Sequence, residues 1–508
     1  MRRAGLLHTT SLLLATASTA VAQSEASSPW PMQSYKSTPL QAPYLNVTKN
    51  GKTEPGFLFF GPRVSDTEYG HPAIYADDGE LAWLGESGAI FATQPQMLDG
   101  EPVLAYWNGT DMLGFGFGAI SILNSSYQEI YHITLPSTEE HPFVTIADPQ
   151  TFPSYIDLHE SQLTDDGTIL VTAVNVTQMD LSPLGGPKDG WVQDGLVYEI
   201  DLKTNEVLFR WSTVEHLSQM PMSYSELPLQ GKGVNKTAPY EYPHLNSVAK
   251  YGNSYLVSSR YMCTIFLLDK NGDVTWRLHG QKGGDFDLFT ESSFCFQHDA
   301  RFRLLSEDTI ILQLHNNENA DMTTPTTMTT GIVLELDMKT KRVSLLEKMF
   351  DAEDPVSAPS QGSYQNLDNG HVLMQHGAIP KLEEYDENGA LVMRARFGFD
   401  ATTQSYRGYR FPWVGRPRTS PSVLACPEKG QMAVYVSWNG ATDVQAWKIL
   451  AGPESDKLSA VQTTTRNGFE TKIWVKDVSE MVMVEAVGGL TTQRVLSKGL
   501  TTSLLYND

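Results

Sequence analysis

The chain has 508 residues, of which 41% are hydrophobic, and its formal net charge is −22 at pH 7. This charge excludes general nucleic-acid binding and argues against docking on anionic lipid, because phosphate groups would be repelled over most of the surface. The length alone would suit two or three domains, but the pattern of elements predicts one large closed β-structure.

The first element in chain order is a targeting segment over residues 1–22. Met1–Arg3 supplies positive charge, residues 6–17 form a short apolar stretch, and Ala20–Ala22 has the pattern of a cleavage site. We therefore predict a protein that is secreted or stays in the lumen of the secretory pathway. No membrane span is expected, since no later segment has 18 uninterrupted apolar residues. Predicted glycosylation sites, all in the first half, are Asn46, Asn108, Asn124, Asn175 and Asn235.

Next comes an extended entry segment, expected over residues 23–56, and then short alternating apolar runs separated by polar turns. Asp-Gly and Asn-Gly between such runs indicate hairpins, because both residues tolerate positive φ. Repeated hairpins without helical crossovers predict an all-β fold, a single β-propeller of six blades over residues 57–508, with a β-sandwich as the alternative. Residues 212–241 lack alternation and are predicted to be a long loop. The clearest turns are 77–79, 165–167, 203–205, 270–272, 339–341, 368–370 and 387–389.

Common catalytic and cofactor motifs are missing from the sequence. There is no GxSxG elbow, P-loop, dinucleotide-binding glycine motif, CxxC, HExxH or EF-hand, so no metal and no cofactor is predicted. Cys263, Cys295 and Cys426 predict one disulfide and one free thiol in a secreted chain, and their spacing leaves the pairing open.

Polar residues gather instead where strands begin. Segments 157–160, 242–247 and 296–301 each contain a histidine before or within an apolar run, and Arg260 follows the strand expected at 255–259. In a propeller these positions face the axis, where separate blades converge. Imidazole, amide and guanidinium groups aimed at one point would bind the oxygen of a sulfate, phenolate or enolate. Taken singly, each residue is more often structural, but their recurrence in successive units favours a site.

These segments resemble the arylsulfotransferase (ASST) family. The residues that carry the resemblance are Pro243–Val248, Tyr255–Arg260 and Phe296–Ala300, with further similarity at 43–47, 56–59, 74–83 and 405–410. The similarity extends from about residue 40 to 450 and looks like the fungal branch of the family. The family fold is a six-bladed propeller, in agreement with the hairpin pattern.

The resemblance implies a set of roles for single residues. His298 would take a sulfuryl group covalently, and a neutral imidazole is a competent nucleophile. Arg260, His244 and Asn246 would hold the sulfuryl oxygens. His159 would assist proton movement on the phenol.

Some fungal relatives are similar to cofactor-free pericyclases, including hetero-Diels–Alderases that join a quinone methide to a terpene alkene. The same His and Arg groups would hydrogen-bond the quinone-methide carbonyl, and an aromatic wall would orient the partners. Candidates for that wall, each also an ordinary core residue, are Tyr261, Phe294, Tyr406 and Trp413.

We therefore expect an enzyme acting on a small aromatic, phenol- or tropolone-type molecule, with a terpene as co-substrate if it is a pericyclase. The pericyclase ranks first, because secretion and the lack of the N-terminal β-sandwich of bacterial sulfotransferases argue against sulfuryl transfer. The alternatives are an aryl sulfotransferase that acts through a sulfo-histidine and a non-catalytic extracellular binding propeller. The oligomeric state is left open.

Overall fold

The computed structural model describes residues 29–64, 70–112, 114–146, 151–320 and 327–488, and the backbone of 495–496. In these ranges the regular structure consists of β-strands and short 3₁₀ helices, so the predicted all-β fold is confirmed. No helix in the described part of the chain is long and apolar enough to cross a membrane. The predicted signal peptide lies outside the described residues. The 3₁₀ helices are η1 (Ser182–Leu184), η2 (Val214–His216), η3 (Met222–Tyr224) and η4 (Thr290–Ser292).

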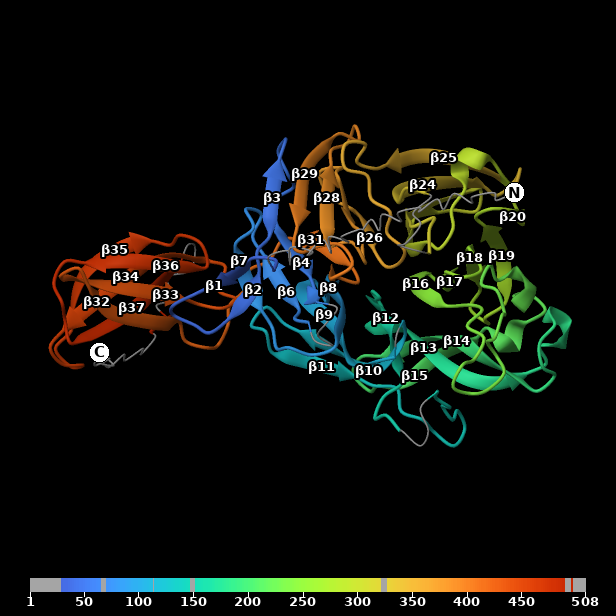
Figure 1. Ribbon diagram of the computed structural model, residues 1–508, viewed down its shortest axis with the longest axis horizontal. Coiled ribbons are helices and arrows are strands. Elements are labelled where there is room, and N and C mark those ends of the chain that lie inside the picture. The colour runs from blue at the N-terminus through green and yellow to red at the C-terminus, as the bar shows by residue number, and fades with distance from the viewer. Residues whose placement is uncertain are drawn as a thin grey trace, which may run out of the picture.

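Strands between residues 46 and 411 form runs around a common axis, antiparallel except for the parallel pair of β21 with β25 (Figure 1). The first two runs are β31 (Gly408–Phe411), β4 (Phe57–Phe60), β6 (Ala73–Tyr75) and β7 (Leu81–Leu84), then β8 (Ile90–Leu98), β9 (Glu101–Asp111), β10 (Gly116–Leu123) and β11 (Glu129–Ile133). The next two are β12 (Ile156–Leu163), β13 (Thr168–Met179), β14 (Gly190–Asp201) and β15 (Val207–Ser212), then β16 (Leu245–Tyr251), β17 (Ser254–Ser259), β18 (Thr264–Leu268), β19 (Val274–His279) and β20 (Gly283–Gly284). The last two are β22 (His298–Leu305), β23 (Thr309–Asn316), β24 (Thr330–Asp337), β25 (Arg342–Met349) and β21 (Asp287–Leu288), then β26 (Ser363–Asn366), β27 (Val372–Gln375), β28 (Lys381–Tyr385), β29 (Leu391–Arg396) and β3 (Asn46–Lys49).

The innermost strands of these runs are β8, β12, β16, β22, β26 and β31, and they contact one another in that cyclic order. This propeller-like ring places the beginnings of the inner strands at one mouth of the axis. The number of blades stays a prediction, because Gly118 of β10 pairs with Ile156 of β12 and joins two runs into one eight-stranded sheet.

Strands from the two ends of the propeller segment close the ring. β31 pairs with β4, with Tyr409 opposite Phe59, and β3 pairs with β29. A short pair, β5 (Arg63–Val64) with β30 (Thr403–Gln404), lies beside the first of these joints. The expected extended entry segment therefore contributes a strand to the last run.

All seven predicted turns connect hairpin strands. Gly79 between β6 and β7 has φ of 94°, a backbone conformation that residues with a Cβ rarely adopt. At 203–205 the Asp201 carboxylate accepts hydrogen bonds from the backbone N–H groups of Lys203 and Thr204 instead. The predicted long loop over 212–241 contains η2 and η3 and buries Met220 and Tyr240 against β13 to β18.

Residues after 421 form two further sheets, which differ from the expectation of one propeller over 57–508. They share no described strand with the propeller runs, enclose their own apolar core, and lie at one side of the molecule in Figure 1. Asn439 joins them to β7 through two hydrogen bonds with the Leu84 backbone. The sheets are β32 (Ser422–Glu428), β33 (Gln431–Ser437) and β36 (Glu470–Val475), and β35 (Ser459–Thr465), β34 (Val444–Gly452), β37 (Met481–Gly488) and β38 (Val495–Leu496).

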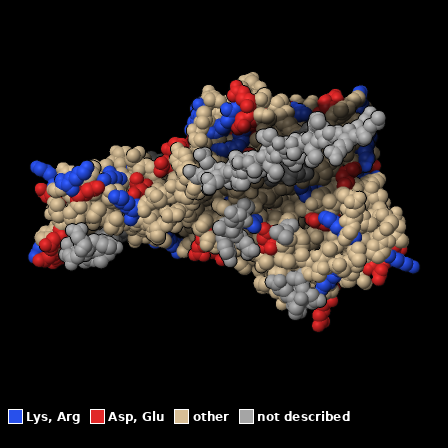
Figure 2. Space-filling model, in the orientation of Figure 1, with Lys and Arg blue, Asp and Glu red and all other residues tan. Residues whose placement is uncertain are grey.

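A small sheet of β1 (Met32–Ser34) and β2 (Gln41–Pro43) links the two parts. Between these strands, Ser37 hydrogen-bonds Glu470 and Ser437 of the C-terminal sheets. On the face seen in Figure 2, basic side chains gather over the C-terminal sheets beside acidic ones, and both signs are scattered over the propeller. The C-terminal sheets are therefore held on the outside of the ring, away from its axis.

Candidate functional site

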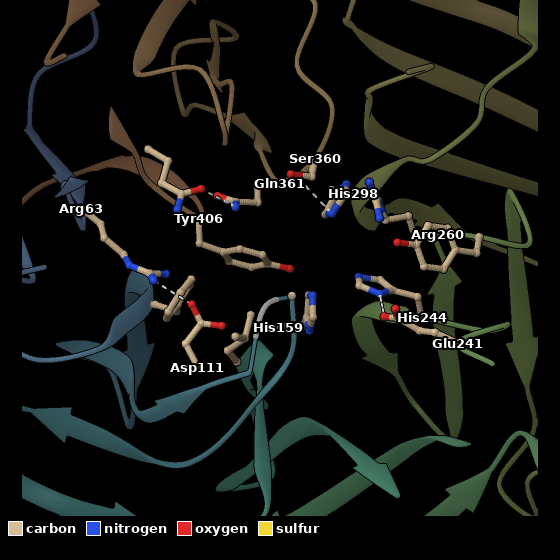
Figure 3. Close-up of a pocket in the computed structure, with 15 residues that line it drawn as sticks. Arg63, Asp111, His159, Glu241, His244, Arg260, His298, Ser360, Gln361 and Tyr406 are labelled. Atoms are coloured by element: carbon tan, nitrogen blue, oxygen red, sulfur yellow. Dashed lines mark hydrogen bonds and ion pairs between the residues drawn. The ribbon is translucent and has the colours of Figure 1, made fainter. Parts of the chain in front are cut away.

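Side chains from the beginnings of the inner strands surround a cavity of about 440 Å³ at one mouth of the axis (Figure 3). This volume suits a small organic molecule. His159, His244, Arg260 and His298 face the cavity together, and we call them the histidine cluster. The ring centroids of His159 and His244 are 4.7 Å apart. The structure thus brings together four residues that the sequence places up to 139 positions apart (159 to 298).

His298 is the first residue of β22 and is buried. The Asn317 amide donates to the carbonyls of Ala358 and Gln361, so its oxygen, 2.8 Å from His298 Nδ1, must be the acceptor. The His298 proton is thereby fixed on Nδ1, and the lone pair is on Nε2. Burial and then the Arg260 charge lower the pKa of His298 well below its usual range, so the ring is neutral at physiological pH.

The Nε2 lone pair of His298 already has a partner. The backbone N–H of Gln361 donates to it at 3.1 Å, from a residue whose φ is 66°. The Gln361 side chain lines the same cavity and donates to Gln404 at 2.8 Å. His298 is therefore held as a hydrogen-bond acceptor in this state, not as an unengaged nucleophile.

His159 forms an acid–imidazole pair with Asp157. Its Nδ1 lies 2.5 Å from Asp157 Oδ2, and both side chains are nearly fully buried. Burial opposes ionisation of Asp157, but His159 and the backbone N–H of Gly116 outweigh it and lower the Asp157 pKa. Since Nδ1–H donates to the carboxylate, Nε2 of His159 can accept a proton from a molecule in the cavity.

His244 has the same type of partner on the other side. Its Nδ1 bonds Glu241, and its φ is 44°, at the position just before β16 begins. Burial lowers the pKa of His244, Glu241 counteracts this, and His159 and Arg260 lower it further, so the net direction is down. His244 and His298 are therefore neutral rings, and both His159 and His244 have a carboxylate at Nδ1.

Arg260 is 7% exposed and has no ion-pair partner among the residues that the structure describes. One terminal nitrogen donates to the Pro359 carbonyl at 2.8 Å, and Nε has no hydrogen-bond partner in the described chain. The guanidinium stacks on the Tyr261 ring, with 4.7 Å between its carbon and the ring centroid. Buried charges are normally paired, so an unpaired cation at a cavity indicates a site for an anion or an electron-rich oxygen.

A disulfide joins the two segments that carry Arg260 and His298. It links Cys263 and Cys295, while Cys426 is a free, half-buried thiol in the C-terminal sheets. The Cys263 N–H also donates to the Arg260 carbonyl at 3.1 Å. The bridge thus fixes the distance between the backbones of the cation and the central imidazole.

Below the histidine cluster lies a buried ion network. Glu160 and Asp299, each next in sequence to a cluster histidine, point away from the cavity, as neighbours in a strand do. Glu160 binds Arg407 at 2.8 Å and Arg301 at 2.8 Å, and Arg301 also binds Asp299 at 2.9 Å. These pairs connect β12, β22 and the segment before β31, so they hold the floor of the site rigidly.

Of the other predicted site residues, two line the cavity and three do not. Tyr261 and Tyr406 contribute to its wall. Asn246 is fully buried and donates to the Gln297 carbonyl at 2.7 Å, because a bulge between Leu245 and Ser247 turns it from the cavity.

Phe294 and Trp413 are also placed away from the cavity. Phe294 packs against Gly280 in the core between the fourth and fifth runs. Trp413 donates to Tyr127 at 2.9 Å on the outer side of the first run. The prediction that these two residues belong to a substrate wall is therefore wrong: both fill core.

Sequence reasoning missed several residues of the cavity. Glu241 precedes His244 by three positions, a spacing that could have suggested the pair. Arg63, Phe91 and Asp111 come from far earlier in the chain and gave no motif. Within the described ranges, no group of three or more His, Cys, Asp or Glu side chains has the arrangement of a metal site.

Comparison with solved structures finds propeller-like chains at low similarity. A protein of unknown function from Bacteroides caccae has 13% identity and a TM-score of 0.37, covering 70% of this chain and 98% of that one. The GH43 protein BlXynB of Bacillus licheniformis has 10% identity and a TM-score of 0.31, covering 81% and 89%. Virginiamycin B lyase of Staphylococcus aureus has 10% identity and a TM-score of 0.31, covering 78% and 97%. These likenesses carry no argument about activity.

A search of curated proteins finds no match. A family model described as Arylsulfotransferase (ASST) matches residues 94–398, more than half of the chain. The match includes all four residues of the histidine cluster. The chain therefore belongs to the arylsulfotransferase (ASST) family.

Proposed function

We propose that this protein transfers a sulfuryl group from an aryl sulfate to a phenol-type acceptor through His298. The observation that carries the proposal is Arg260, a buried guanidinium without an ion-pair partner in the described chain, set beside neutral imidazoles at a cavity. A sulfate ester supplies the negative oxygens that such a cation lacks. Membership of the family supports the same reaction.

In the first half-reaction, His298 Nε2 attacks sulfur, an N–S bond forms, and the S–O bond to the aryl group breaks. The phenolate leaves as an anion or takes the proton that His159 holds after an earlier turnover. Arg260, which lines the cavity, would stabilise the sulfuryl oxygens through its N–H donors and positive charge. The Nδ1–H of His298 keeps donating to Asn317, which supports the positive charge of the sulfurylated ring.

In the second half-reaction, an acceptor phenol attacks the sulfur of the sulfo-histidine. His159 Nε2 takes the phenol proton, and Asp157 stabilises the imidazolium that results. The N–S bond breaks and His298 regains its lone pair. The sum is one aryl sulfate and one phenol exchanged for another phenol and aryl sulfate, so no further reagent is needed.

A second function, the cofactor-free pericyclase, is supported by the state of His298. Its lone pair accepts a hydrogen bond from Gln361, and Asn246, the predicted oxygen ligand, is turned away from the cavity. For a cycloaddition, neither residue needs to react. Arg260 would donate a hydrogen bond to a quinone-methide carbonyl and make the quinone methide a better acceptor for a terpene alkene.

Mass spectrometry of the intact, deglycosylated protein after incubation with p-nitrophenyl sulfate tests the first function. Sulfuryl transfer predicts a gain of one sulfuryl group and release of nitrophenol by the wild type, and neither by His298→Ala. His132→Ala, at an exposed histidine of β11, is the matched control and should behave as the wild type. No adduct and no nitrophenol would overturn the proposal, and coupling of a quinone methide with a terpene alkene by His298→Ala would establish the second function.

We also propose that the protein is exported and glycosylated. Asn46, Asn108 and Asn235 are exposed and the other two sequons are partly exposed, so all are accessible to a glycan. The Cys263–Cys295 disulfide suits an oxidising compartment. A change in mass on glycosidase treatment of protein collected from culture medium tests both points.

A further inference from the structure

The cavity has a second polar end, opposite the histidine cluster. Arg63 of β5 and Asp111 at the end of β9 form an ion pair of 2.7 Å, and their side chains are 11% and 17% exposed. Figure 3 shows this pair on one side of the cavity and Arg260 on the other, with the Tyr406 ring between them. Both residues line the cavity itself, so the pair is within reach of a bound molecule.

The Arg63 end is built for a ligand more than for stability. Burying an ion pair costs desolvation that its attraction barely offsets, so such a pair adds little to folding. Arg63 Nε has no hydrogen-bond partner in the described chain, and neither has the side-chain oxygen of Gln361, which lines the same cavity. The guanidinium carbon instead lies 4.6 Å from the centroid of the Phe91 ring, which is a cation–π contact.

The chemistry of this end differs from that of Arg260. A guanidinium paired with a carboxylate is neutral overall, and it offers an N–H donor and an oxygen acceptor side by side. A hydroxyl group needs both, whereas an anion would be repelled by the carboxylate of Asp111. The pair therefore suits an alcohol or a phenol hydroxyl better than a second sulfate or a carboxylate.

Aromatic side chains occupy the space between the two ends. Ring centroids of Phe91 and Tyr406 are 6.4 Å apart, and those of Tyr406 and His298 are also 6.4 Å apart. A flat ring can lie along this wall with one substituent at each end. Resting on the proposed function, we infer that Arg63 and Asp111 select acceptor phenols that carry a second hydroxyl group at the end of the molecule opposite the reacting oxygen.

Matched acceptors in which a methyl group replaces the second hydroxyl test this inference. With p-nitrophenyl sulfate as donor, kcat/KM is measured for 4-(hydroxymethyl)phenol against 4-ethylphenol, and for 4-(2-hydroxyethyl)phenol against 4-propylphenol. The wild type should prefer the hydroxyl-bearing member of at least one pair by about ten-fold or more, because a site built to bond a hydroxyl rejects the analogue without it. In Arg63→Met and in Asp111→Asn the preference should fall towards one.

Two controls make the result interpretable. Arg416→Met removes the arginine of an exposed ion pair with Asp443 in the C-terminal part and should keep the wild-type preference. Asp111→Asn keeps the shape of the pair, so it tests the inference even if Arg63→Met fails to fold. Equal kcat/KM for the members of both pairs, in a wild type that does transfer sulfuryl groups, would overturn the inference alone.

Binding separates a failure of the inference from a failure of the proposed function. Saturation-transfer NMR with the same four phenols, on the wild type and on Arg63→Met, needs no turnover. If no acceptor is sulfurylated, the proposed function fails, yet tighter binding of the hydroxyl-bearing phenols that Arg63→Met abolishes would still support the inference. Equal binding of all four by the wild type would contradict it.

Discussion

Buried charges at the cavity and buried charges in the floor beneath it differ in whether they have an ion-pair partner. On the cavity side, Arg260 lacks an ion-pair partner among the described residues, and the imidazoles of His298 and His244 stay neutral. On the floor side, Glu160 is fully buried and binds two guanidinium groups. Adjacent residues of one strand thus line the cavity and pair within the floor. Removing one partner of a buried pair leaves an uncompensated charge and is costly, whereas Arg260 has no ion-pair partner in the described chain to lose.

Asp194 of β14 is a buried carboxyl group that differs from both Arg260 and Glu160. It lies beneath His159 and His244, and it accepts hydrogen bonds from Ser212 and the backbone of Val214 without an ion pair in the described chain. Burial raises its pKa to about 7, against the hydrogen bonds, which lower it. The carboxyl group is therefore largely protonated below neutral pH. In that state it is neutral and needs no ion-pair partner.

The largest effect is expected on the floor side. Arg407→Met leaves Glu160 with one fewer cation at a position that is 0% exposed, and breaking a buried pair in this way costs about 3–5 kcal/mol. Denaturant unfolding should show this loss in the free energy of unfolding, with activity lost only in proportion to unfolded protein. A fully stable Arg407→Met protein would contradict the structural role of the network.

On the cavity side the expected loss is in rate. Arg260→Gln should lower kcat/KM for aryl sulfate by about 10²–10³-fold, the range found for removal of one transition-state donor. Its thermal midpoint should stay at or above that of the wild type, because an unpaired buried charge is removed. Steady-state kinetics and a thermal melt measure the two quantities. A lowered midpoint with unchanged kcat/KM would show that Arg260 stabilises the fold and is not needed for the reaction.

The pH dependence of stability should reveal Asp194. Its folded pKa of about 7 lies above the unfolded value of 3.8, so the folded state binds more protons between these values and stability falls as pH rises. Between pH 5 and 8 the wild type should lose about 2–3 kcal/mol that Asp194→Asn keeps. Denaturant titrations at the two pH values measure the difference, and parallel behaviour of both proteins would mean that Asp194 is ionised throughout.

The smallest effect is expected for an ion pair at the solvent-exposed surface. Arg416→Met breaks the pair of Arg416 with Asp443, whose side chains are 59% and 32% exposed, and should change the free energy of unfolding by less than about 1 kcal/mol. The same denaturant titration serves. A larger loss would show that the anchoring of the C-terminal sheets depends on this pair.

The sequence predicted hairpins well, because an Asp-Gly or Asn-Gly turn is a local property of a few residues. It pointed to the histidines that line the cavity because they recur near the beginnings of apolar runs: His298 is the first residue of β22 and His159 the fourth of β12. The boundary of the propeller was not visible, since the strands after 421 alternate as the blades do. Only packing separates them, through a core of their own.

Other features of the site have causes that no local pattern contains. Asn246 lies two residues after His244 and would share its face in a regular strand, but the bulge in β16 reverses it. The pairing of Cys263 with Cys295 depends on two loops meeting in space. Arg63 and Asp111 lie 48 positions apart in sequence and meet only when the ring is formed.

Closure of the ring by strands from its two ends determines when the molecule can be completed. Residues 57–60 pair on one edge with the nearby residues 73–75, but on the other edge with residues 408–411, so the chain must be synthesised almost to the end of the propeller before both edges are paired. Contacts so distant in sequence form slowly, and until they do, β4 exposes a strand edge that other chains can pair with. Nascent chains should therefore depend on holding chaperones, and truncation before residue 408 should yield aggregates, not a smaller propeller.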